Sequence, residues 1–287
     1  MRVNIGDFLF ASISRIMAFS VLVILSAIFI TLIVKAMPAI DHFGIQFFTD
    51  QVWAPNMEIF GAAPSIYGTV VSTLLAIFIA TPIAIGIAIF LTEIAHDKLK
   101  GTVGTLIELL AAIPSVIYGM WGLFYFSPYV REIFGGNGLG LLTAGLVLAI
   151  MIIPFTASIS RDSMNTTPDI LKESAYALGA TKWDVIKDVV IPYAKIGIIG
   201  SIIISLGRAL GETMAVTFVM GSAQRIPSSL VEPATSIPVT LANQFTEADA
   251  DLYFSSLYYL ALILFIVSFA FIAVAKFLFL NKAGVQK

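Results

Sequence analysis

Long uncharged apolar runs alternate with shorter polar stretches along the whole chain. Six runs stand out: Ile16–Val34, Tyr67–Leu91, Leu109–Phe126, Leu139–Ile159, Ile196–Val219 and Leu257–Ala275. Each approaches or exceeds the roughly 20 residues that a helix needs to cross a bilayer, and all but the fifth lack charged residues. Membrane β-strands would instead be short segments of alternating polarity. The pattern therefore predicts an all-α polytopic membrane protein with six transmembrane helices.

Composition supports a membrane location. Hydrophobic residues make up 59% of the 287 residues, charged residues make up 12%, and the mean hydropathy is +0.96. A soluble domain carries about 25% charged residues. No basic tract points to nucleic acid, and the absence of cysteine excludes disulfides and thiolate chemistry. We expect the first apolar run to be retained, because no A-x-A cleavage site follows it in Lys35–Pro38.

Basic residues are distributed unevenly between the predicted loops. Of the 16 lysines and arginines, three lie in or beside the first, third and fifth loops, and one lies within the fifth run. The other 12 lie at the termini and in the second and fourth loops: Arg2, Arg15, Lys98, Lys100, Arg161, Lys172, Lys182, Lys187, Lys195, Lys276, Lys282 and Lys287. Because loops rich in lysine and arginine stay in the cytoplasm, both termini are expected to be cytoplasmic. The predicted organisation is a cytoplasmic segment at 1–15, a transmembrane domain at 16–280 with a cytoplasmic loop at 160–195, and a cytoplasmic tail at 281–287.

The fourth loop has the sequence of two capped helices. Thr167–Asp169 is typical of a helix start with Thr167 as the N-cap, and Gly179 fits the position after a helix end that needs a positive φ. Thr181–Asp184 fits a capping box that opens a second short helix, which Pro192 is expected to terminate. The loop is therefore predicted to be a compact helix–turn–helix.

The spacing within this loop resembles the EAA motif of ABC-importer permeases, E-A-A-x₃-G-x₉-I-x-L-P. Glu173, Ala175, Gly179 and Pro192 match, while serine, valine and isoleucine stand at the other three positions. The resemblance implies a coupling helix that docks in a cleft of a separate ATP-hydrolysing subunit. The alternative is an ordinary cytoplasmic loop with well-capped helices.

The sequence contains no G-x-x-x-x-G-K-[ST] loop that would cradle the phosphates of ATP. We therefore expect a transport subunit rather than an enzyme, with no cofactor bound by this chain and with ATP and Mg²⁺ on the partner ATPase. An intramembrane enzyme that uses Glu212 as acid or base would need further catalytic groups at membrane depth. The two histidines, His42 and His96, lie outside the apolar runs, and metal-ligand spacing is absent.

The fifth run holds two charged residues, Arg208 and Glu212. Four residues apart, they are predicted to share one face of a helix near mid-membrane, where an unpaired charge costs about 3 kcal/mol or more. One interpretation is a structural ion pair between helices, and the other is a lining of the solute path. In the second, Arg208 binds a tetrahedral oxyanion and Glu212 offers the empty guanidinium a partner. Glu212 would also accept a hydrogen bond from protonated phosphate, which sulfate cannot donate.

Two segments resemble one particular family of permeases. Gly207–Val216 looks like the fifth-helix signature of the PstC family of bacterial phosphate ABC transporters, and Ile113–Gly122 in the third run is similarly characteristic. The resemblance implies that Arg208 and Glu212 are the intramembrane pair of that family, and that the protein transports inorganic phosphate across the bacterial inner membrane. It also implies the partners: a homologous PstA-like permease, a PstB-like ATPase dimer and a periplasmic PstS-like phosphate-binding protein.

Other functions stay open from the residues alone. The arginine would serve sulfate or molybdate equally well, and the sister permease PstA shares the coupling motif. A purely structural membrane scaffold would leave Arg208, Glu212 and the EAA-like motif dispensable.

Overall fold

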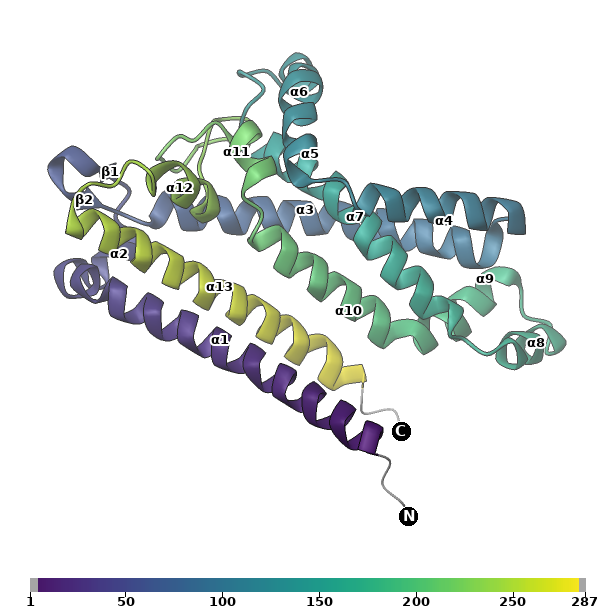
Figure 1. The fold of residues 1–287 in the computed structure, drawn as a ribbon. Coiled ribbons are helices and arrows are strands. Elements are labelled where there is room, and N and C mark those ends of the chain that lie inside the picture. The colour runs from purple at the N-terminus through teal and green to yellow at the C-terminus, as the bar shows by residue number, and fades with distance from the viewer. Residues whose placement is uncertain (1–4, 284–287) are drawn as a thin grey trace.

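The computed structural model describes residues 5–283, which form helices apart from one two-stranded hairpin and the connecting loops (Figure 1). Besides α-helices and strands, the fold contains one 3₁₀ turn, Pro55–Met57, and three π-helical turns, Phe90–Ile94, Gly122–Phe126 and Ile186–Val190. In chain order the elements are α1 (Ile5–Phe43), α2 (Gln46–Thr49), β1 (Trp53–Ala54), η1 (Pro55–Met57), β2 (Ile59–Phe60), α3 (Ala63–Ile89), η2 (Phe90–Ile94), α4 (Asp97–Ala111), α5 (Ser115–Trp121), η3 (Gly122–Phe126), α6 (Ser127–Phe134), α7 (Leu141–Asn165), α8 (Asp169–Ala177), α9 (Lys182–Val185), η4 (Ile186–Val190), α10 (Ile191–Leu210), α11 (Met214–Met220), α12 (Ile237–Gln244) and α13 (Asp251–Ala283).

The described residues hold five helices that are long and apolar enough to cross a membrane, and a sixth crossing if one bent pair counts as a span. The all-α fold class with six crossings is confirmed on that count. The bent pair, Lys98–Ala111 and Ser115–Phe134, turns by 90°. The interval predicted as the third span, Leu109–Phe126, straddles this bend and is not one straight helix. Pro114 explains the bend, because proline lacks an N–H and disfavours helical geometry at the preceding residue.

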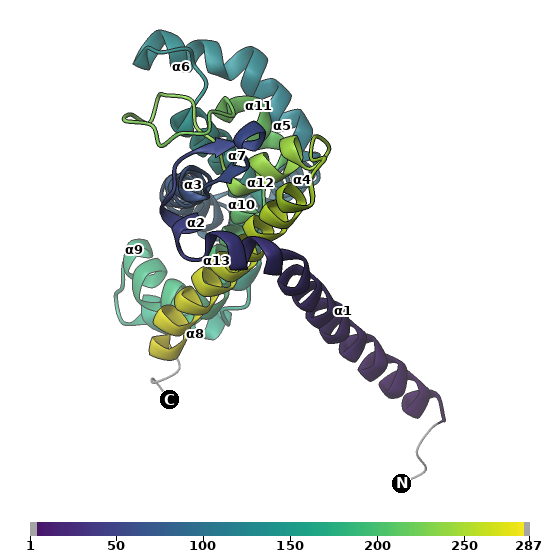
Figure 2. The same cartoon turned by 90° about the vertical axis from the view of Figure 1, so that its left-hand side faces the viewer.

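The long helices run roughly along one direction, and the two ends of the bundle differ (Figure 1). Both ends of the described chain lie toward the same end of the bundle as α8 and α9, which we call the coupling end. The β1–β2 hairpin and α12 lie at the opposite end, which we call the hairpin end. Figure 2 shows α1 leaving the body of the molecule, so that α1 and α13 are close at the hairpin end and separate toward the termini.

The hairpin end is held by a cluster of aromatic side chains between α1, the hairpin and α13. Trp53 lies opposite Phe60 in the antiparallel pair, and their rings meet edge-on at 5.1 Å between centroids. Phe47 stacks on Tyr259 at 4.5 Å, and all four side chains are buried. Burying rings of this size is a major source of packing energy. The cluster therefore fixes the first and last long helices to each other.

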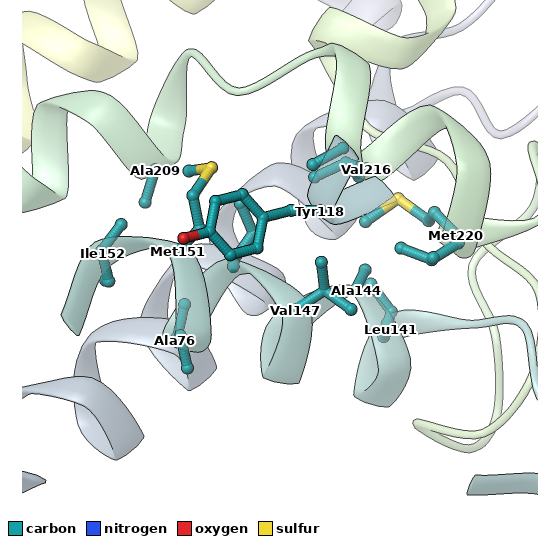
Figure 3. Close-up of a cluster of buried hydrophobic side chains, with 14 of the residues drawn as sticks. Ala76, Tyr118, Leu141, Ala144, Val147, Met151, Ile152, Ala209, Val216 and Met220 are labelled. Atoms are coloured by element: carbon teal, nitrogen blue, oxygen red, sulfur yellow. The ribbon is translucent and has the colours of Figure 1, made fainter. Parts of the chain in front are cut away.

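The largest apolar core lies where α3, α5, α7 and α11 meet, and Figure 3 shows side chains of α7 and α11 converging on Tyr118 of α5. Gly119 makes the close approach of α5 to α11 possible. A Cβ at this position would lie 2.8 Å from the Cα of Ala215. Only glycine therefore allows this separation without a shift of the backbone.

Candidate solute path and coupling loop

The fifth apolar run is broken in its second half. Helix α10 ends at Leu210, Gly211 follows as its cap, and α11 begins at Met214. The prediction that Arg208 and Glu212 share one face of a continuous helix is therefore wrong. Two local causes are visible: glycine is a poor helix former, and an oxygen of the Glu212 carboxylate accepts a hydrogen bond from the backbone N–H of Ala215 at 3.1 Å. That bond satisfies one of the free N–H groups at the start of α11.

Arg208 lies in the last turn of α10 and is half-buried. Its guanidinium carbon lies 4.0 Å from the centroid of the Phe155 ring in α7. Its Nε is buried and lacks a hydrogen-bond partner among residues 5–283. Within the same residues no ion pair joins Arg208 to Glu212. The guanidinium thus packs on an aromatic ring, and the described residues leave its Nε–H without a hydrogen-bond acceptor.

The two segments that carry the family resemblance meet in space. Gly119, within Ile113–Gly122, lies against Ala215, within Gly207–Val216. Tyr118 belongs to the same buried cluster as Ala209, which follows Arg208 (Figure 3). The Tyr118 hydroxyl donates to the carbonyl of Leu110 at 2.9 Å and so holds α5 to the end of α4 across the bend at Pro114. The segments that follow and flank the two helix breaks therefore pack against each other.

The coupling loop folds largely as its caps predict. Gly179 has a φ of +87°, and the N–H of Ala180 bonds to the carbonyl of Ala175 at 3.1 Å, which closes α8 in a Schellman motif. At the start of α9, Asp184 N–H donates to Thr181 Oγ1 at 3.3 Å and Asp184 Oδ2 accepts from Thr181 N–H at 2.9 Å. The predicted capping box is confirmed. Helix α7 runs to Asn165 and the next long helical stretch begins at Lys182, so both ends of the predicted loop 160–195 are helical.

Two details of the loop prediction are wrong. Thr167 is not the N-cap of α8: Pro168 holds that position, and Thr167 Oγ1 is buried without a partner in the described chain. Pro192 does not terminate a helix either. The chain stays helical from Lys182 to Leu210, with the π-helical turn η4 immediately before α10 and Pro192 in the first turn of α10. The π-helical turn η4 directly precedes the proline and accommodates its missing N–H within the continuous helix.

Helix α8 presents the motif residues at the coupling end. Glu173 is exposed, and Ala175 is half-buried against the cluster that contains Val185 and Val190. Apolar side chains on and next to α8 are exposed, with Leu178 at 90%. An exposed apolar surface of this kind suits contact with another subunit.

Two ion pairs at the coupling end were not predicted from the sequence. Lys172 Nζ lies 2.7 Å from Glu93 Oε1, and Arg161 Nη2 lies 2.8 Å from Glu108 Oε1. The signal that could have found them is position: Glu93 lies two residues after the end of one apolar run and Glu108 directly precedes another. An acidic residue at such a boundary needs water or a basic partner.

A family model described as "binding-protein-dependent transport system inner membrane component" matches residues 80–282. The phosphate transport system permease protein PstC of Mesorhizobium japonicum is 47% identical over 300 aligned positions, covering 98% of this chain and 92% of the relative. The chain belongs to the PstC family. Its likeness extends to PstC of Pasteurella multocida, at 46% identity over 97% of this chain and 93% of the relative. A probable PstC of Methanocaldococcus jannaschii is 35% identical over 81% of each chain.

Solved structures share the fold with this PstC family member at low identity. A bacterial alginate ABC transporter, in complex with its pentasaccharide-bound periplasmic protein, has a chain with a TM-score of 0.67, 14% identity and coverage of 97% of this chain and 96% of that chain. The inward-facing MetNI methionine ABC transporter gives a TM-score of 0.60, 21% identity and coverage of 78% and 98%. The fold is that of ABC importer permeases. As the permease subunit of an ABC transporter, the chain is a transport subunit.

Proposed function

We propose that this chain is the permease subunit of an ATP-driven phosphate importer, in which it forms the path for inorganic phosphate together with a homologous PstA-like permease. The observation that carries the proposal is Arg208. It lies at the break between α10 and α11, next to Phe155, and its Nε has no protein partner within residues 5–283. The names of the relatives, which are phosphate permeases, support phosphate as the solute.

An arginine over an aromatic ring suits transient binding of an oxyanion. The ring stabilises the cation while the site is empty, and a guanidinium on an aromatic face keeps N–H donors at its edge that match tetrahedral oxyanions. Glu212 lies across the helix break, and one of its oxygens is already used by the N–H of Ala215. The other oxygen would accept a hydrogen bond from protonated phosphate. That role requires that sulfate be transported poorly.

The coupling loop would connect this path to the energy source. The exposed face of α8, with Glu173 in the EAA-like motif, would dock in a cleft of a PstB-like ATPase dimer that holds ATP and Mg²⁺. A periplasmic PstS-like protein would deliver phosphate to the hairpin end. Closure of the ATPase dimer would then move α8 and switch access between the two sides of the membrane. Both termini and the coupling end would lie in the cytoplasm.

The test is uptake of labelled phosphate by cells that lack their own phosphate importer. Cells would express the three partner subunits with or without this chain, in the presence of excess sulfate or molybdate. We expect uptake only with this chain and no competition from either anion. Strong competition by sulfate would reassign the chain to another oxyanion, and the absence of phosphate uptake with all four subunits present would refute the proposal.

A further inference from the structure

Helix α8 is joined to the membrane helices by one ion pair that is largely shielded from water. Lys172 Nζ of α8 lies 2.7 Å from Glu93 Oε1, and the exposed fractions of the two side chains are 19% and 8%. None of the residues of α8 is itself fully buried. The pair is therefore the best shielded polar anchor of a helix that otherwise lies on the surface.

Glu93 belongs to the π-helical turn η2, where α3 ends. Such wide turns are rare and frequently lie at functional sites. The turn carries its own support, because Thr92 Oγ1 donates to the carbonyl of Ala88 at 3.0 Å. A second π-helical turn, η4, lies on the other side of α8 and contributes Val190 to the cluster that Ala175 contacts. The ion pair to Glu93 and the packing of Ala175 near Val190 thus both join α8 to helix segments that depart from regular α-helical geometry.

From Glu93 a continuous series of contacts leads to Arg208. Helix α3 packs along α7, where Gly145 lies directly against the side chain of Leu75. Helix α7 carries Phe155, whose ring lies under Arg208. Packed helices move as rigid units, so a displacement of α3 or α7 would change the position of the ring.

We propose that Glu93 and Lys172 are positioning residues that transmit the movement of α8 into α3 and α7, and so couple ATP hydrolysis to access at Arg208. The inference rests on the proposed function. The pair is not needed simply to hold α8 in place, because α8 is also attached through Ala175 and through its covalent connections to α7 and α9. A shielded pair resists separation far more than an exposed one, since separating it leaves an unpaired charge away from water.

The experiment uses the assembled complex of this chain, the second permease and the ATPase dimer in proteoliposomes with the binding protein, and measures the phosphate moved per ATP hydrolysed. Glu93→Gln and Lys172→Gln remove one charge each, and the double exchange Glu93→Lys with Lys172→Glu restores a pair of opposite orientation. Glu108→Gln is the matched control, because its pair with Arg161 connects α4 to α7 and does not involve α8. The amount of assembled complex is measured for each variant.

We expect each single variant to assemble and hydrolyse ATP while its phosphate-per-ATP ratio falls at least about fivefold, as loss of a typical coupling energy would produce. The double exchange should recover part of the ratio, and Glu108→Gln should keep it. An unchanged ratio in the assembled single variants would overturn the proposal. So would failure of the single variants to assemble, which would assign the pair to assembly instead. A complex with the unaltered chain that moves no phosphate would count against the proposed function, not against this inference.

Discussion

The guanidinium of Arg208 lies at a helix end, where three kinds of neighbour meet. Phe155 covers it from α7, Gly211 ends its helix, and Glu212 turns its carboxylate toward the first turn of α11. Each neighbour changes what the charge can do. The ring stabilises the cation without using its donors, and the helix break keeps Glu212 from pairing with it. The site is thus left with unused donors, which is what reversible binding of an anion requires.

Replacement of Phe155 by leucine tests the contribution of the ring. The change removes the cation–π contact but keeps an apolar side chain, so Arg208 would lose its fixed position. We expect the KM for phosphate uptake to rise about two- to thirtyfold, in line with a contact of about 0.5–2 kcal/mol. Phe155→Tyr keeps the ring and should stay close to the unaltered protein. Equal KM values for the leucine and tyrosine variants would show that the ring has no role in binding.

At the scale of elements, the sequence predicts contacts between residues that are close together in the chain and misses contacts between residues that are far apart in it. The capping box at Thr181 and the positive φ at Gly179 were predictable because their partners lie within a few residues along the chain. The pair between Glu93 and Lys172 spans 79 residues, and no local pattern specifies it. The break after Leu210 was missed because hydropathy alone does not distinguish one long helix from two short ones. The prediction that Pro192 ends a helix was wrong because the π-helical turn before it accommodates the proline within a continuous helix.

The contact between α5 and α11 gives a prediction about stability. Gly119→Ala would place a Cβ 2.8 Å from the Cα of Ala215, where no flexible side chain can move aside. We expect the purified protein to lose about 1–3 kcal/mol of stability, which thermal unfolding in detergent would record as a lower Tm. Gly86→Ala in α3 is the control, because nothing lies within 4 Å of its added Cβ. Similar Tm values for the two variants would contradict the packing described here.

At the scale of the whole molecule, the distribution of basic residues and the arrangement of the helices both distinguish the two ends of the bundle. The coupling end carries both ends of the described chain, α8 and most of the described lysines and arginines, and the hairpin end carries the aromatic cluster (Figure 1). This division accounts for the predicted orientation, with the coupling end in the cytoplasm. The position of α1 beside α13 could not be predicted, because both helices are apolar on all sides and their sequences do not specify a contact face.

The orientation can be measured directly because the chain has no cysteine. Ser229 is exposed in the loop before α12, and Lys98 is exposed in α4 near the coupling end. In spheroplasts with an intact inner membrane, a membrane-impermeant thiol reagent should label Ser229→Cys at once. It should label Lys98→Cys only after the membrane is permeabilised. The reverse pattern would show that the protein is inserted in the opposite sense.

Whether Arg208 forms part of the phosphate path can be measured as ATP-driven phosphate uptake into proteoliposomes that contain the complete complex. Arg208→Gln keeps a polar, unbranched side chain but removes its charge and shortens it, and Arg225→Gln does the same at an exposed loop arginine whose Nη2 lies 3.8 Å from Glu232. We expect uptake to fall in Arg208→Gln by a factor of about 10² or more, because a buried charged contact to the solute is lost, and to continue in Arg225→Gln. Uptake by Arg208→Gln at the rate of the Arg225→Gln control, with equal amounts of assembled complex, would contradict this expectation.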